Sequence, residues 1–230
     1  MVYRSGYGFD GIKSIRRFLR IRGDDCKNPA LVVVKEFDPW QIVIAYYELK
    51  GFRMKELSIG ESILQLVVGD ITAQDTEAVV NAANSRLAPG GGVAGAIHRA
   101  AGPGLWEECK GLGGCETGEA KITKGYGLPN AYVIHTVGPV YSGSDKDPVL
   151  LRSCYCSSLK VADENGVKSV SFPALSTGIF GYPVSEAARI AIRAIRDYLS
   201  GDTGIRLVRM VLYDQASFDA HADALEDPEG

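Results

Sequence analysis

The chain has 230 residues, of which 46% are hydrophobic and 23% are charged, and this composition is typical of a folded globular protein. Lysine and arginine number 25 against 28 aspartate and glutamate residues, so the net charge is −3. That balance argues against a dedicated sequence-reading DNA-binding protein, whose domain is normally basic. The longest unbroken apolar run, residues 42–47, is too short to span a bilayer, so we expect no membrane partner.

The cysteines indicate a reducing compartment. Their number is odd, they are scattered, and no two form a CxxC pair: Cys26, Cys109, Cys115, Cys154 and Cys156. We therefore expect reduced thiols, a cytoplasmic location and no metal centre built on cysteine.

Residues 1–53 differ in charge from the rest of the chain. They carry ten basic and six acidic residues, whereas residues 54–230 carry fifteen and twenty-two. Residues 11–22 have apolar residues at helical spacing opposite basic ones, which predicts a short basic amphipathic helix. Two β-rich runs follow, 31–37 and 41–49, and predict a loose hairpin. The segment is either a tail or decoration packed on the main domain, or a basic surface that binds nucleic acid or acidic lipid. We predict that the compact domain spans residues 54–230.

From residue 54 onward, strand and helix patterns alternate. Strands are predicted at 63–68, 78–81, 120–125, 132–137, 169–172 and 207–213, and helices at 93–101, 148–164, 183–199 and 217–225. The third helix is the clearest, because Pro183 stands at its start and Gly201 just beyond its end. This alternation predicts an α/β domain with a central, largely parallel sheet that helices cover on both faces.

Two strand–loop–helix junctions are rich in glycine and small residues. The first contains Asn84 and the run Gly90-Gly-Gly-Val-Ala-Gly95, and the second contains Ser176-Thr-Gly-Ile-Phe-Gly181. Such loops let the backbone approach a ligand, and the helix that follows offers unpaired N–H groups and the positive end of its dipole. Loops at the carboxyl ends of parallel strands can share one crevice. Together they predict a site for a diphosphate.

Two other motifs fit less well. The run from Gly90 to Gly95 satisfies G-x-G-x-x-G, but Glu116, about where an acidic residue should end a strand, lies in a glycine-rich turn. The run 174–178 nearly matches a nucleophile elbow, with Ser176 as nucleophile, but only His221 follows it as a base. We therefore favour neither a dinucleotide-binding Rossmann fold nor a serine hydrolase.

Five blocks in unbroken order resemble the macrodomain family, and most closely its MacroD-type branch. They are Gly69-Asp-Ile-Thr72, Val80-Asn-Ala-Ala-Asn84, Gly90–Gly102, His135-Thr-Val-Gly-Pro139 and Ser176–Pro183. The resemblance covers roughly residues 56–225. It implies a three-layer α/β/α sandwich with a mixed, largely parallel sheet, which binds ADP-ribose and in many members hydrolyses ADP-ribosyl bonds.

The resemblance also implies roles for individual residues. Asp70 would accept from the adenine amino group, with Ile71 beside it and Tyr213 packed on the ring, while Asn81 would bond the local backbone and shape the first loop. Asn84 would hydrogen-bond the distal ribose as the catalytic residue, with an amide that can both donate to and accept from the sugar hydroxyls. Phe180 would lie beside that sugar. The diphosphate would be bound by residues of both loops: Gly90, Gly91, Gly92, Val93, Ala94, Ser176, Thr177, Gly178, Ile179 and Phe180.

The sequence departs from the family pattern at Ala94, where many MacroD-type hydrolases carry an aspartate that positions or activates water. Family members with the same alanine resemble this chain and are reported as hydrolases. We therefore expect an ADP-ribose-binding domain that removes mono-ADP-ribose from proteins or deacetylates O-acetyl-ADP-ribose, with no cofactor and no metal. The alternatives are a non-catalytic reader of ADP-ribosylated proteins and a phosphatase for ADP-ribose-1″-phosphate.

Overall fold

The computed structural model describes residues 16–19, 32–37, 42–49 and 52–227, with side chains from Met54 onward. Its elements, in chain order, are β1 (Arg16–Leu19), β2 (Val32–Phe37), β3 (Ile42–Leu49), β4 (Phe52–Ile59), β5 (Ser62–Val68), the 3-10 turn η1 (Ile71–Ala73), β6 (Ala78–Ala82), α1 (Gly92–Ala101), α2 (Pro103–Gly111), β7 (Ala120–Lys124), β8 (Tyr132–Thr136), α3 (Lys146–Glu164), β9 (Ser169–Phe172), α4 (Val184–Leu199), β10 (Leu207–Leu212) and α5 (Gln215–Glu226). The predicted strands and helices from residue 63 onward are all present.

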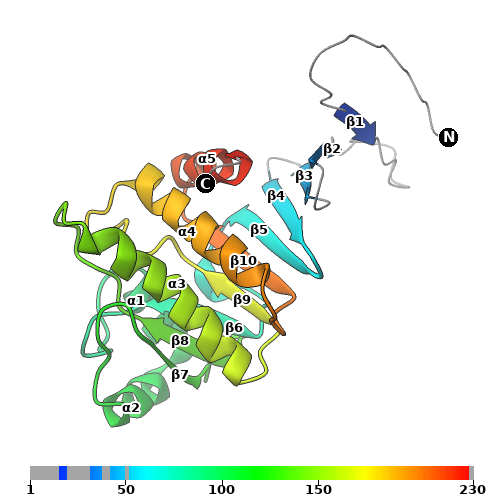
Figure 1. Cartoon of the computed structure of the whole chain (residues 1–230). Helices are drawn as coiled ribbons and strands as arrows, with labels where there is room; N and C mark the ends of the chain where they lie inside the picture. The colour runs from blue at the N-terminus through cyan, green and yellow to red at the C-terminus, as the bar shows by residue number, and fades with distance from the viewer. Residues whose placement is uncertain (1–15, 20–31, 38–41, 50–51, 228–230) are drawn as a thin grey trace.

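The strands form one sheet in the order β1-β2-β3-β4-β5-β10-β9-β6-β8-β7 (Figure 1). The five central strands, β5, β10, β9, β6 and β8, run parallel to one another. β7 is antiparallel to β8, and β4 is antiparallel to β5. From β4 onward, this arrangement confirms the predicted mixed, largely parallel sheet, and it brings the carboxyl ends of five strands to one edge.

Helices cover both faces of the sheet, which gives three layers. α3, α4 and α5 pack on one face and α1 and α2 on the other, as Figure 1 shows. Each face of the sheet has its own hydrophobic core, and consecutive strand residues point into different cores. Val80 and Leu66 lie in the larger core, under α3 to α5, whereas Val79 and Val67 lie in the smaller core, under α1 and α2. A strand buried on both faces carries apolar residues on both, as the adjacent pairs Leu66-Val67 and Val79-Val80 do.

The amino-terminal strands extend the sheet beyond β4. The predicted hairpin is confirmed, because β2 and β3 pair antiparallel, although its turn lies outside the described residues. The helix predicted over 11–22 is wrong where the structure describes it: Arg16–Leu19 is strand β1, paired with β2. A short amphipathic segment is a weak helix on its own, and pairing with an available strand edge satisfies its backbone groups instead.

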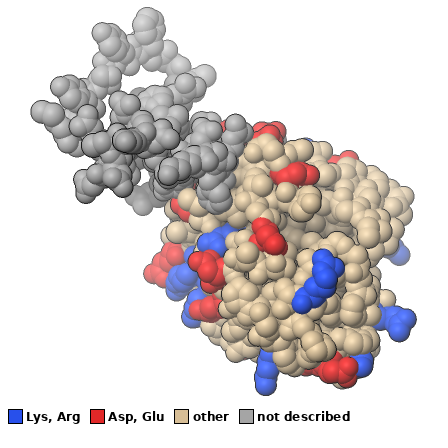
Figure 2. All heavy atoms as spheres, turned by 180° about the vertical axis from the view of Figure 1, so that it is seen from behind, with Lys and Arg blue, Asp and Glu red and all other residues tan. Residues whose placement is uncertain are grey.

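One helix was not predicted. α2 starts at Pro103, directly after Gly102 closes α1 with a φ of +83°. Proline at a first helical position and glycine at a helix end were both available as signals, and Leu105 and Cys109 are buried four residues apart. None of the described helices has the length and apolarity needed to cross a membrane. On the face seen in Figure 2, acidic and basic side chains of the described residues are interspersed.

Candidate functional site

The two glycine-rich loops face each other across one cleft. Loop 83–91 joins β6 to α1, loop 173–183 joins β9 to α4, and β6 and β9 are neighbouring parallel strands. The cleft between them has a volume of about 250 Å³. It is lined by Ala82, Ala83, Asn84, Gly90, Gly91, Gly92, Val93, Ala94, Gly138, Ala174, Leu175, Ser176, Gly178, Ile179 and Phe180. The juxtaposition that the sequence predicted for the two loops is therefore present.

The first loop is held close to α1 by glycine. A Cβ on Gly95 would lie 2.4 Å from the carbonyl oxygen of Gly90, so the loop can fold back over the helix only because that side chain is absent. Gly92, the first residue of α1, has a φ of +55°, a conformation that favours glycine. The first turn of α1 therefore presents its backbone N–H groups at the cleft.

The second loop is bonded to itself and to the segment after β8. The amide of Tyr182 donates to the carbonyl of Ser176 (3.0 Å), and the amide of Tyr141 donates to that of Phe180 (2.9 Å). Ser176 has a φ of +64°, which is strained for a residue with a side chain. Its hydroxyl is buried and has no hydrogen-bond partner among the described residues. A strained, unsatisfied serine at a cleft wall is typical of a binding loop.

No lining residue of the cleft is ionisable. The lining consists of glycine, alanine and other apolar residues, with Asn84 and Ser176 as its two polar side chains. An anion bound here would be held by backbone N–H groups and the dipole of α1 rather than by lysine or arginine. The cleft therefore suits an anion such as a phosphate group, and its lining offers no side chain as a general base.

Asn84 uses most of its amide on its own loop. Its Oδ1 accepts hydrogen bonds from the backbone amides of Arg86 (3.2 Å) and Ala88 (3.1 Å), and its Nδ2 donates to the carbonyl of Ala88 (2.7 Å). The amide was expected both to donate to and accept from a ligand. The oxygen already accepts two hydrogen bonds, and one of the two N–H groups donates to Ala88. The second N–H of the side chain is therefore left for a ligand.

Asn81 lies outside the cleft. It is fully buried, and its Nδ2 lies 3.1 Å from Nδ1 of His135, so it bonds a side chain rather than the local backbone that the sequence predicted. Burial lowers the pKa of His135 to about 3, which leaves the ring neutral. With Nδ1 accepting from Asn81, Nε2 carries the proton and donates to the hydroxyl of Thr123 (2.9 Å). Thr177 also does not line the cleft; its hydroxyl donates to the carbonyl of Ala174.

The residues expected to bind adenine lie at the same edge of the sheet, next to β5 and β10. Asp70 and Ile71 follow β5 and Tyr213 follows β10, two parallel strands whose last residues are paired. Asp70 is exposed, and hydrogen bonds from the amide and hydroxyl of Thr72 lower the pKa of its carboxyl. Ile71 is buried, whereas the side chain of Tyr213 is 92% exposed. An aromatic ring this exposed is free to pack on a ligand.

Sequence reasoning missed Gly138, which lines the cleft directly after β8. A Cβ there would lie 2.1 Å from Oγ of Ser176, so glycine leaves room for the second loop. The signal was the same as for the other loops, because β8 is the next parallel strand beside β6. His221, the only base that a serine nucleophile could use by sequence, is buried in α5, where its Nδ1 contacts the carbonyl of Ser217.

A larger hollow, of about 710 Å³, lies at the opposite edge of the sheet. It is formed by the β4–β5 turn and the loop after α4, at the amino ends of β5 and β10. Arg206 lines it and is paired with Glu61 (2.9 Å). Open parallel sheets bind their ligands at the carboxyl edge, so we assign the site to the smaller cleft.

The fold and the cleft together define a three-layer α/β/α domain with a cleft between two glycine-rich loops. The Macro domain family model matches residues 80–191. A macro domain-containing protein of Chlorobaculum tepidum is 51% identical over 164 residues, 71% of this chain and 95% of that protein. ADP-ribose glycohydrolase MACROD2 of Homo sapiens is 54% identical over 141 residues, 60% of this chain and 33% of that protein.

The Trypanosoma brucei macrodomain, solved in complex with ADP-ribose, has a similar structure, with a TM-score of 0.67 and 42% sequence identity. The similarity covers 70% of this chain and 68% of that one. The chain belongs to the Macro domain family.

Proposed function

We propose that the chain binds ADP-ribose in the cleft and hydrolyses ADP-ribosyl bonds. Its reaction would release mono-ADP-ribose from acidic side chains of proteins or deacetylate O-acetyl-ADP-ribose. The observation that carries this proposal is the pair of backbone-lined loops opposed at the carboxyl edge of the sheet. The names of the human relative, an ADP-ribose glycohydrolase, and of the Trypanosoma brucei complex with ADP-ribose support it.

The order of the strands supports one orientation of the ligand. The diphosphate would lie between the loops after β6 and β9, held by the amides of Gly91 to Ala94 on one side and of Ser176 to Phe180 on the other. The distal ribose would contact the free N–H of Asn84. The adenosine would extend past β9 toward β10 and β5. There Asp70 would accept from the adenine amino group.

Hydrolysis in this cleft would depend on positioning and on the substrate itself. No lining side chain titrates, and Ala94 supplies no carboxylate. Asn84 would orient the ribose, a phosphate of the ligand would hold and activate the attacking water, and loop amides would stabilise the phosphate charge. The absence of a protein base from the lining equally favours a second candidate, a non-catalytic reader of ADP-ribosylated proteins.

The test is an ADP-ribose titration followed by a turnover assay on the same sample. Release of ADP-ribose from an automodified protein supports the hydrolase. Tight binding without release supports the reader. Inorganic phosphate formed from ADP-ribose-1″-phosphate supports a phosphatase, and no binding of ADP-ribose overturns all three.

We also propose that the macrodomain is residues 54–230, that residues 1–53 are an extension outside it, and that the protein acts in the cytoplasm. The free thiols of Cys109, Cys115, Cys154 and Cys156 support a reducing compartment. β4 begins at Phe52, so a chain starting at Met54 keeps six of its eight residues. Unchanged ADP-ribose affinity in that shortened chain is expected, and loss of folding would contradict the boundary.

A further inference from the structure

The segment that carries Asp70 has little structure of its own. Between β5 and β6 the chain forms one 3-10 turn, η1, capped by the Asp70 carboxylate, which accepts from the amide of Thr72 at 2.8 Å. Such a short turn is not stable in isolation. Ile71 anchors the turn in the smaller core, and the residues that follow it make further polar contacts with the sheet.

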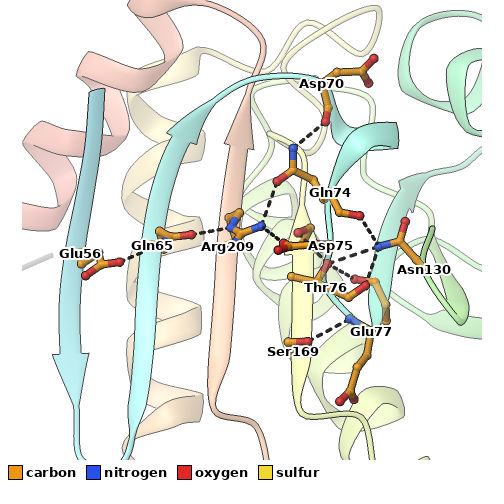
Figure 3. A network of polar contacts seen from close by, with 12 residues as sticks. Glu56, Gln65, Asp70, Gln74, Asp75, Thr76, Glu77, Asn130, Ser169 and Arg209 are labelled. Carbon is orange, nitrogen blue, oxygen red and sulfur yellow. Dashed lines mark hydrogen bonds and ion pairs between the residues drawn. The ribbon is translucent and has the colours of Figure 1, made fainter. Parts of the chain in front are cut away.

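Arg209 of β10 makes those contacts from the face of the sheet (Figure 3). Its Nη1 donates to Oε1 of Gln74 (3.1 Å) and to Oδ1 of Asp75 (2.6 Å), and its Nε donates to Oε1 of Gln65 on β5. The guanidinium is thus fixed between a neighbouring strand and the end of the turn. The Arg209 side chain is only 16% exposed, while that of Asp75 is 86% exposed.

Gln74 connects Arg209 to Asp70 through two hydrogen bonds. Its Nε2 donates to the backbone carbonyl of Asp70 at 2.6 Å, while its Oε1 accepts from Arg209. One side chain therefore joins the fixed guanidinium to the backbone of the residue expected to bind adenine, as Figure 3 shows. The exposed Asp75 shares the guanidinium but makes no such link.

We infer that Arg209 is a positioning residue that sets the selectivity of the site for adenine. It acts through Gln74 on the orientation of Asp70, and this inference rests on the proposed binding of ADP-ribose. A carboxylate accepts from the 6-amino group of adenine and is repelled by the 6-oxo group of hypoxanthine. Selectivity between these bases requires the Asp70 carboxylate to point at position 6 of the base, whereas affinity for the diphosphate does not depend on Asp70.

The turn has a second attachment that does not involve Arg209. Nδ2 of Asn130 donates to the backbone carbonyls of Gln74 (3.1 Å) and Thr76 (2.6 Å). The segment therefore stays on the sheet when Arg209 is replaced. What is lost is the fixed position of the Asp70 backbone, and with it the direction in which its carboxylate points. Lysine would not replace Arg209, because one ammonium cannot reproduce the planar fork that contacts three side chains.

The experiment compares two ligands, ADP-ribose and inosine diphosphate ribose, by calorimetry on the full chain. We expect the unaltered protein to prefer ADP-ribose by about tenfold or more, as for one hydrogen bond to a charged group. Arg209→Met is expected to reduce that preference to about threefold or less, mainly by weakening ADP-ribose. Gln74→Ala should do the same, and the double variant should be no worse than either single variant, because both act on one link.

Two controls separate positioning from general damage. Asp75→Asn removes the ion pair but keeps the link through Gln74, so its preference should stay within about twofold of the unaltered protein. Arg152→Met removes an exposed ion pair with Asp197 on the opposite face and should change neither affinity. The inference is overturned if Asp75→Asn loses as much selectivity as Arg209→Met, or if Gln74→Ala keeps it.

Asp70→Ala distinguishes failure of this inference from failure of the proposed function. If Asp70→Ala abolishes the preference for ADP-ribose while Arg209→Met retains it, Arg209 has no positioning role but the adenine site stands. If Asp70→Ala leaves the preference unchanged, the adenine assignment itself is wrong, and the role of Arg209 is lost with it.

Discussion

Asn84 and Ala88 are joined by two hydrogen bonds: Nδ2 of Asn84 donates to the carbonyl of Ala88 at 2.7 Å, and the amide of Ala88 donates back to Oδ1 at 3.1 Å. The side chain that faces the cleft is therefore also the one that closes its loop. Any replacement of Asn84 alters the loop and removes the single N–H left for a ligand, and the two effects have to be measured separately.

Replacing Asn84 with alanine should lower turnover on ADP-ribosylated protein by about 10²-fold, the usual cost of one donor aimed at a reacting group. ADP-ribose affinity should fall less, because the backbone amides remain. Asn84→Asp keeps the acceptor for the amides of Arg86 and Ala88, so it should be more stable to heat than Asn84→Ala yet equally inactive. Release at the unaltered rate from Asn84→Ala would contradict the catalytic role.

Ala94 tests whether a missing carboxylate limits the reaction. Ala94 lines the cleft in the first turn of α1, where an acidic side chain interacts well with the helix dipole. Ala94→Asp should raise single-turnover release by about tenfold or more, since a positioned base contributes about 10²–10⁴-fold. Ala94→Asn has the same shape without the base and should not. Equal rates for the two variants would show that water is already positioned by other groups.

Gly95 tests the approach of the first loop to α1. Gly95→Ala should weaken ADP-ribose binding by about tenfold or more, because its Cβ would displace the carbonyl of Gly90. Gly111→Ala is the matched control: it also lies in a helix, and its Cβ would meet nothing within 4 Å. It should bind normally and be slightly more stable. Similar affinities for both variants would mean that loop 83–91 does not bind the ligand.

Buried histidines predict the pH dependence of stability. Burial lowers the pKa of His135 to about 3 and of His221 to about 4, below the ordinary 6.5. Between these values the unfolded chain binds more protons than the folded one, so stability falls as the pH drops below 6.5. Each histidine should cost about 2 kcal/mol between pH 7.5 and 5. Urea unfolding of His221→Asn should lose about that much less over the same range, and an unchanged pH dependence would refute the assignment.

Strands and helices with clear sequence patterns and recognisable end residues could be predicted from the sequence. Strand β9 alternates serine with apolar residues and ends before Pro173, and helix α4 has a strong apolar stripe between Pro183 and Gly201; their predicted bounds agree with the structure to within a residue. α2 was not predicted because it has few apolar residues and begins in a glycine-rich stretch. Residues 16–19 were assigned to a helix by spacing alone, although a strand partner decides their conformation.

The site was predictable in outline and less so in detail. Neighbouring parallel strands bring their following loops together, so the opposed loops could be inferred from the order of elements. The hydrogen bonds of Asn81 and Asn84 could not, because Asn81 lies near the end of β6 and Asn84 just after it, and only packing decides which is buried. The role of Arg209 was equally invisible, since its partners lie more than 130 residues away in sequence.

The most direct test of the central claim is a crystal structure of the full chain with ADP-ribose. We predict that the two phosphates lie between α1 and loop 173–183, bonded to backbone amides on both sides. Phosphates bound to arginine in the hollow beside the β4–β5 turn, or in contact with only one of the two loops, would contradict it.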